Sequence, residues 1–216
     1  MKQARTVKFA AWVGIVILIV AVLVFAAIRF LTDIPNVLGG SLPPEGDFAR
    51  RYARYPMLAY SHILPGLVFL VAAPFQISRR FRTRHLRMHR KLGKALLFVG
   101  ALTGISAIAV GVVMPFGGLV ETSATIVFGM YFLLALRLGY RAVRRFDLQA
   151  HRHWMVRAFA LAIGVGTIRA WGGIFEAFGI PLADSFGLSF WLAFVLHAIA
   201  AEVWLWWRPD APPLGI

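Results

Sequence analysis

The sequence predicts an all-α integral membrane protein, a six-transmembrane-helix bundle, and two observations support this prediction. Hydrophobic residues make up 60% of the 216-residue chain, above the share in soluble domains. The apolar residues gather into six runs, each long enough to cross a bilayer, which takes about 20 residues. We expect a single membrane domain over residues 1–216, with spans at 9–28, 57–77, 92–114, 119–138, 154–178 and 186–207.

The basic residues predict the orientation of the bundle. The chain holds 23 Lys and Arg residues and has a net charge of +14, and most of these residues fall between alternate spans. Short cytoplasmic segments are enriched in Lys and Arg, so both termini are expected in the cytoplasm (N-in/C-in). Topology and attraction to anionic phospholipids account for the charge, and no nucleic acid is expected as a partner. The chain has no cysteine, which excludes disulfides and thiol chemistry.

The segments outside the spans give further expectations. The first apolar run is too long for a secretory signal, so it is read as a retained span. In the outer loop at 31–56, Gly and Pro argue against regular structure through Glu45. The piece DFARRYARY that follows predicts a short amphipathic helix with Asp47 as its N-cap. The tail RPDAPPLGI, which begins at Arg208, is expected to be a frayed end.

Two basic linkers resemble each other and suggest a repeat of two helical hairpins. ISRRFRTRHLRMHRKLG joins spans two and three, and AVRRFDLQAHRHWMV joins spans four and five. Each has Arg-Arg-Phe, a polar stretch, and then His-Arg at the start of a helix. Such a repeat would bring His89 and His151 to similar depth on facing helices. The alternative is a chance likeness between two basic linkers.

Polar side chains within a membrane bundle are costly and therefore mark candidate sites. They form two levels along the six spans. Gln76 lies on nearly the same face of span two as His62, and Arg169 and Glu176 share a face of span five and could pair. The inner level contains His85, His89, His151, His153 and Gln76, and the outer level contains His62, Glu121, Arg169 and Glu176, with His197 between them.

Two levels of histidine on different helices predict two b-type haems, because neutral imidazole is a good ligand for haem iron. The inner haem iron would be held by His89 with His151 or His153, and the outer one by His62 with His197. Arginines would pair with the propionates, and electrons would cross the bilayer to a quinone or another membrane subunit. The propionate partners would be Arg90 and Arg152, and the glycines that admit the macrocycle would be Gly104, Gly111, Gly164 and Gly166.

Several alternatives stay open. Histidine and arginine at a membrane boundary often contact lipid phosphates, which would fit a non-catalytic accessory subunit of a larger complex whose His-Arg motifs bind anionic lipid or an acidic loop of a partner. Four imidazoles could bind zinc or copper, although the surrounding arginines disfavour a bare cation. Arg169 with Glu176 could be a structural pair or part of a transport pathway. A single hydrogen bond would satisfy His197.

The order of these motifs resembles the bacterial membrane family filed as domain of unknown function 2306, over roughly residues 57–170. The motifs are His62, then Pro-Phe-Gln at 74–76, His-Arg-x-x-Gly at 89–93 and His-Arg-x-Trp-Met-x-Arg at 151–157. The resemblance implies a multi-pass protein of the bacterial inner membrane and no established reaction. A looser similarity to cytochrome b561 and ferric-reductase-like bundles implies stacked haems, but span four lacks the histidine that those bundles use.

Overall fold

The computed structural model describes residues 2–207, so the expectation for the tail and Arg208 lies outside the described residues. Every element within residues 2–207 is helical. Six helices are long and apolar enough to cross a membrane, which confirms the fold class. The helices are α1 (Lys2–Leu38), α2 (Arg50–Arg54), α3 (Pro56–Ile77), α4 (Arg79–Arg84), α5 (Leu86–Val113), α6 (Gly118–Arg144), α7 (Leu148–Ala177) and α8 (Leu182–Trp207).

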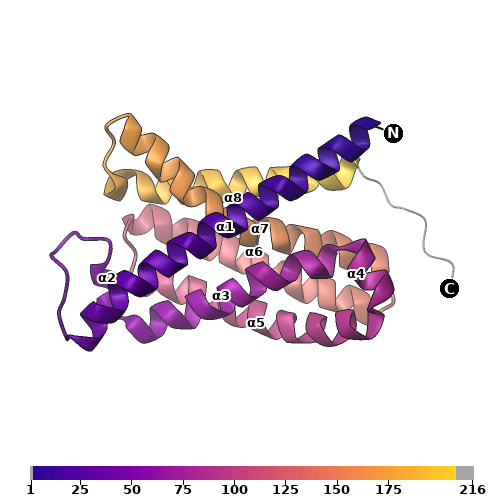
Figure 1. The fold of residues 1–216 in the computed structure, drawn as a ribbon, viewed down its shortest axis with the longest axis horizontal. Helices are drawn as coiled ribbons and strands as arrows, with labels where there is room; N and C mark the ends of the chain where they lie inside the picture. The colour runs from indigo at the N-terminus through magenta and orange to yellow at the C-terminus, as the bar shows by residue number, and fades with distance from the viewer. Residues whose placement is uncertain (1, 208–216) are drawn as a thin grey trace.

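The six long helices form one bundle (Figure 1). The most extensive contacts join α7 to α8, α3 to α5, and α6 to both α5 and α7. The first helix crosses the bundle obliquely and has smaller contacts with α3 and α7 (Figure 1). Most of the apolar surface of α1 is therefore exposed, as expected for a helix that faces lipid.

The bundle has two chemically different ends. At one end lie α4, the first turns of α5 and α7 and the last turn of α6, which we call the basic end. At the other lie residues 39–55 with α2, and the turns at 114–117 and 178–181, which we call the loop end. Both ends of the described chain lie at the basic end (Figure 1). The orientation of these ends relative to a membrane, and the hairpin repeat, stay predictions.

Glycines let the helices of the bundle approach closely. A Cβ built at Gly100 would lie 2.8 Å from the ring of Phe69, and one built at Gly104 would lie 2.7 Å from Leu133. Such contacts are typical of packing between membrane helices, where small residues bring backbones together. The four glycines expected to admit a macrocycle each contact a side chain of another helix instead: Gly104 meets Leu133, Gly111 meets Thr125, Gly164 meets Phe194 and His197, and Gly166 meets Leu18.

The connections differ from the expectation in three places. The first helix continues through Pro35 to Leu38, so the outer loop starts later than residue 31. The short helix after this loop is α2, but its N-cap is Ala49 and not Asp47, whose Oδ1 accepts from the Ala49 N–H (2.7 Å). The linker before α5 is itself helical as α4, which begins where Ser78 Oγ accepts from the backbone N–H of Phe81.

Candidate functional site

The polar residues of the basic end come from four helices that meet there. Gln76 lies in the last turn of α3, and His89 and His151 lie in the first turns of α5 and α7. Arg82 lies on α4, between Gln76 and His89 in the chain. The start of α7 is fixed by Asp147, whose Oδ1 accepts from the Ala150 N–H at 2.9 Å. We call Gln76, Arg82, His89, Arg90, His151 and Arg152 the basic-end cluster.

Three buried polar atoms of this cluster have no hydrogen-bond partner among the described residues. They are both amide atoms of Gln76 and the Nδ1 of His89. The Gln76 amide lies against α5, since a Cβ built at Gly93 would be 3.5 Å from Gln76 Oε1. More than nine in ten buried polar groups in proteins have a partner, so three orphaned atoms at one place indicate a ligand or bound water.

The charges beside His89 are positive. The charged neighbours of His89 are Arg82, His151 and Arg90, and no carboxylate is among them. Burial lowers the pKa of Arg82, and repulsion from Arg152 and Arg79 lowers it further. Positive charges held together in a partly buried site cost free energy that a bound anion would offset.

The depth of the cluster matches the boundary between hydrocarbon and headgroups. At about 1.5 Å per residue, His89 lies about 16 Å along the axis from the midpoint of α5. Gln76 and His151 lie about 14 and 17 Å from the midpoints of α3 and α7 by the same measure. Half of a bilayer's hydrocarbon core is about 15 Å thick. In a bilayer centred on these helices, the cluster would therefore lie at the edge of the hydrocarbon core, next to the headgroups.

The two histidines at the start of α7 have different surroundings. The Nδ1 of His151 lies 2.8 Å from the Gly139 carbonyl, to which it donates, so its Nε2 carries the lone pair. His153 instead lies beside the Glu202 carboxylate of α8. His151, and not His153, is therefore the histidine that acts on His89.

The four-imidazole metal site does not form. His85 is exposed and lies against the ring of Phe81, with 5.6 Å between the ring centroids. Within residues 2–207 no three His, Asp or Glu side chains gather in a way that could hold a metal ion. Because the side chains of His85 and His153 diverge from the cluster, the zinc or copper alternative has no support in the structure.

The structure does not bring His62 and His197 together. The Nδ1 of His62 donates to the Thr103 carbonyl of α5 (3.1 Å), and that of His197 donates to the Ala193 carbonyl of its own helix (2.9 Å). Their helices, α3 and α8, do not touch, and α7 contacts both. Gly164 of α7 packs directly against the His197 ring. The residues of this level therefore do not fit the predicted outer haem.

The expected pair of Arg169 and Glu176 is also absent from the described residues. Glu176 is exposed near the end of α7. The Arg169 guanidinium instead lies over the rings of Phe25 (3.7 Å) and Phe48 (4.6 Å), which come from α1 and the loop before α2. Cation–π contacts replace the predicted ion pair because the Arg169 side chain turns toward α1.

Sequence reasoning missed a buried ion pair on α1. Arg29 and Asp33 form a salt bridge one helical turn apart, and Asp33 is 0% exposed. The Tyr60 hydroxyl of α3 also donates to Asp33 Oδ2 (3.3 Å) and so links the two helices. Opposite charges four residues apart within an apolar run could have revealed this pair.

A second missed ion pair joins Arg51 of α2 to Glu121 of α6. Their closest atoms, Nη1 and Oε1, are 3.3 Å apart, and Glu121 is 2% exposed. Glu121 Oε2 also accepts from the backbone N–H groups of Phe116 (2.6 Å) and Gly117 (2.7 Å). The partners are 70 residues apart, so no local sequence signal could have identified the pair.

Phe48 is at the centre of the loop end. Three guanidinium groups surround its ring, from Arg51 at 4.1 Å, Arg169 at 4.6 Å and Arg29 at 5.6 Å. The ring also packs edge-on against Phe116 at 5.0 Å. These contacts hold the loop before α2 on the bundle, so we interpret this cluster as structural.

Fold and polar residues together define a multi-pass α-helical membrane protein with a cationic site at one end. The family model described as "Predicted membrane protein (DUF2306)" matches residues 59–205. The chain therefore belongs to the DUF2306 family, which confirms that resemblance. No curated protein matches the chain, and no solved structure matches it. The looser similarity to haem-binding bundles is not shown.

Proposed function

We propose that this protein binds the phosphate headgroup of an anionic phospholipid in the basic-end cluster and acts as a non-catalytic membrane subunit. One observation carries the proposal: the buried amide of Gln76 and the Nδ1 of His89 lack partners among the described residues, and Arg82 and Arg90 act on His89. A phosphate oxygen accepts from both guanidinium and amide groups, and a phosphate with a hydroxyl-bearing headgroup also donates.

Charge and depth favour a phosphate over the other ligands considered. Arg82 and Arg90 beside His89 repel a bare metal cation. The cluster lies about 14–17 Å from the helix midpoints, at the level of the headgroups. A lipid phosphate therefore needs to move little to reach the site. A nucleic acid would have to approach the membrane surface against the anionic lipids already there.

The proposal is tested by the thermal stability of the purified protein in detergent with added lipid. Phosphatidylglycerol should raise the Tm, and zwitterionic phosphatidylcholine should not. A ligand present at 100 times its Kd stabilises by about 2.7 kcal/mol, which is readily measured. The Arg82→Gln variant should lose most of this lipid-induced rise, because it removes the half-buried guanidinium beside His89.

A matched control is Arg87→Gln, which removes an equal charge from an exposed position in the first turn of α5. This variant should keep the response to phosphatidylglycerol. Equal losses in both variants would show attraction to the general positive charge only and would refute a specific site. If inorganic phosphate alone reproduces the whole rise, the site takes free phosphate and not a lipid.

A second variant, Gln76→Leu, separates ligand binding from a structural role. If the buried amide binds no ligand, its replacement by a side chain of similar size removes two unsatisfied atoms and should raise the Tm without lipid. If the amide binds the phosphate, the same variant should weaken the response to phosphatidylglycerol. A response identical to that of the wild type would contradict the proposal.

A second candidate function is the binding of one b-type haem between His89 and His151. One observation favours it: the Nδ1–H of His151 donates to the Gly139 carbonyl, which leaves Nε2 as a possible ligand, as in many metal-binding histidines. In this candidate Arg90 and Arg152 would pair with the propionates. Bound haem would give the protein a reversible one-electron couple and would permit exchange with a quinone or a partner subunit.

An absorption spectrum distinguishes the two candidates. The protein is purified after expression with ample haem supply, and spectra are taken after air oxidation and after reduction with dithionite. A Soret band with sharp α and β bands on reduction, lost in His89→Ala, would establish the haem. A flat visible spectrum would eliminate it and leave the lipid site untouched.

We also propose that the protein lies in the cytoplasmic membrane of a bacterium with the basic end inside. The support is the charge distribution, because Arg79, Arg80, Arg82 and Arg84 all lie at that end, on α4. Fusing a reporter that is active only in the cytoplasm to the C-terminus tests this orientation. An inactive cytoplasmic reporter, with an active periplasmic one at the same position, would reverse it.

A further inference from the structure

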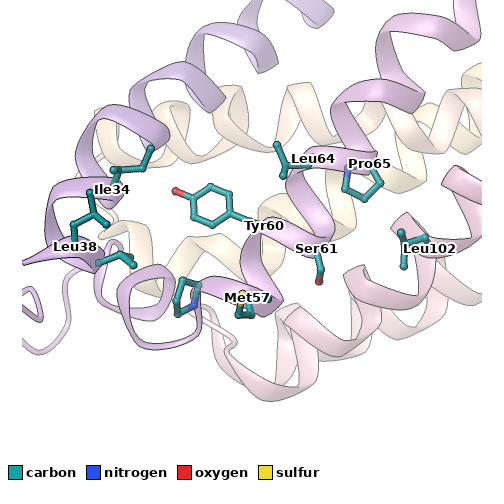
Figure 2. Close-up of a pocket in the computed structure, with 10 residues that line it drawn as sticks. Ile34, Leu38, Met57, Tyr60, Ser61, Leu64, Pro65 and Leu102 are labelled. Carbon is teal, nitrogen blue, oxygen red and sulfur yellow. The ribbon is translucent and has the colours of Figure 1, made fainter. Parts of the chain in front are cut away.

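An apolar groove runs between α1 and α3 at the loop end of the bundle (Figure 2). Its volume is about 560 Å³, within the range of sites that bind small molecules. The side chains of Ile34 and Leu38 line it on α1. On α3 the lining runs from Pro56 to Pro65, and Leu102 of α5 closes the inner end (Figure 2).

The length of the groove matches one leaflet of a bilayer. The ten residues from Pro56 to Pro65 span about 14 Å along α3. The hydrocarbon part of one leaflet is about 15 Å thick, which is half of the core. Because Pro56 is the first residue of α3, the groove begins at one end of the membrane span and runs toward its middle.

The polar hydrogens that face the groove are already donated within the protein. The Tyr60 hydroxyl donates to Asp33, and Ser61 Oγ donates to the Leu58 carbonyl at 2.8 Å. Neither group can donate to a ligand without breaking these bonds. The two hydroxyls therefore do not favour a ligand that needs a hydrogen-bond donor, such as the carbonyl of a quinone. The occupant that fits apolar walls without free donors is a hydrocarbon chain.

A cation lies beside the start of the groove. Arg54 is exposed at the end of α2, two residues before Pro56, and its guanidinium lies 5.5 Å from the ring centroid of Tyr55. Within the described residues it makes no ion pair. An anionic headgroup next to Arg54 would place its hydrocarbon chain at the entrance of the groove, where Met57 is exposed.

From this arrangement we infer that the groove holds one acyl chain of an anionic phospholipid, with the lipid phosphate on Arg54. The bound chain fills the gap between α1 and α3. These two helices are otherwise joined there by the Tyr60–Asp33 hydrogen bond and by the stacking of Phe30 on Tyr60, at 5.0 Å between ring centroids. The lipid is therefore a structural ligand that braces the weakly packed α1. This inference is independent of the basic-end cluster.

Photocrosslinking tests the inference on the full chain. The protein is reconstituted in vesicles that contain phosphatidylglycerol with a diazirine in its acyl chain, irradiated, and analysed by peptide mapping. Label should concentrate on residues 56–65 and on Leu102. Leu64→Trp puts a large ring into the groove and should reduce this label severalfold. Arg54→Gln should reduce it less and should lessen the preference for phosphatidylglycerol over phosphatidylcholine.

The matched control is Val68→Trp, which enlarges an exposed residue one turn farther along the same helix and outside the groove. This variant should keep the wild-type labelling. Label spread evenly over the exposed faces of all six spans would show bulk lipid only and would overturn the inference. Unchanged labelling in Leu64→Trp would do the same. If Leu64→Trp does not fold, native mass spectrometry of the wild type decides, since retention of no phospholipid would refute the site.

Discussion

Replacing Glu121 with alanine should strongly destabilise the bundle, because this carboxylate is almost fully buried and has three partners. It accepts from the backbone N–H groups of Phe116 and Gly117 and pairs with Arg51. Leaving a buried donor unsatisfied costs about 1–3 kcal/mol. Breaking a buried ion pair from one side costs about 3–5 kcal/mol.

These costs overlap, because the same carboxylate oxygens are involved, so we expect a total loss of about 3–6 kcal/mol. With the scaling of soluble domains of this size, about 2–4 °C per kcal/mol, the Tm should fall by on the order of 10 °C. The assay is thermal unfolding of the purified protein in one detergent at one protein concentration.

Two further variants serve as controls for Glu121→Ala. Glu176→Ala removes an exposed carboxylate from α7 and should change the stability by less than about 0.5 kcal/mol. Glu121→Gln keeps one acceptor oxygen for the turn but loses the charge, so its Tm should lie between those of the wild type and Glu121→Ala. If Glu121→Ala and Glu176→Ala unfold at the same temperature, the buried carboxylate does not hold the loop end together and the reasoning fails.

Three other predictions concern packing and buried polar groups. Gly117→Ala should lower the free energy of unfolding by about 1–3 kcal/mol, because its Cβ would lie 2.5 Å from a backbone nitrogen of α8. Gly173→Ala, whose Cβ would have nothing within 4 Å, should leave the Tm unchanged in the same thermal assay. Arg169→Lys should lower the Tm more than Arg169→Met, since a lysine keeps the buried charge but loses the planar stacking on aromatic rings; the opposite order would contradict the cation–π interpretation. His62→Ala should lower the Tm, because the hydrogen bond to the Thr103 carbonyl is lost. The absorption spectrum of any bound haem should not change in this variant; a spectral change would identify His62 as a haem ligand.

The candidate site could be read from the sequence only in part. His89 and His151 follow similar basic linkers, and the structure places both in the first turn of a helix at the same end of the bundle. The choice between His151 and His153 could not be made, because two residues two positions apart point to different sides of a helix. The α7 helix directs His151 to α6 and His153 to α8.

For a similar reason, the structure does not bring together two other pairs of polar residues that the sequence suggests. The spacing of Arg169 and Glu176 puts them on one face of α7, but the Arg169 guanidinium lies over aromatic rings from α1 and the loop before α2. His62 and His197 were grouped by depth, and the depth of a residue does not specify which helix its side chain faces. Depth and face are separate properties, and only the first follows from position along the chain.

The sequence by itself determined the six spans and the positions of the charges along them. Both are local properties, since a membrane helix satisfies its own backbone hydrogen bonds and needs only a sufficient apolar length. Only the tertiary structure decided the pairings, such as Arg51 with Glu121 and the orphaned amide of Gln76 beside His89. These depend on how each helix is rotated against its neighbours, and in lipid that rotation is set by close packing of side chains from distant parts of the chain.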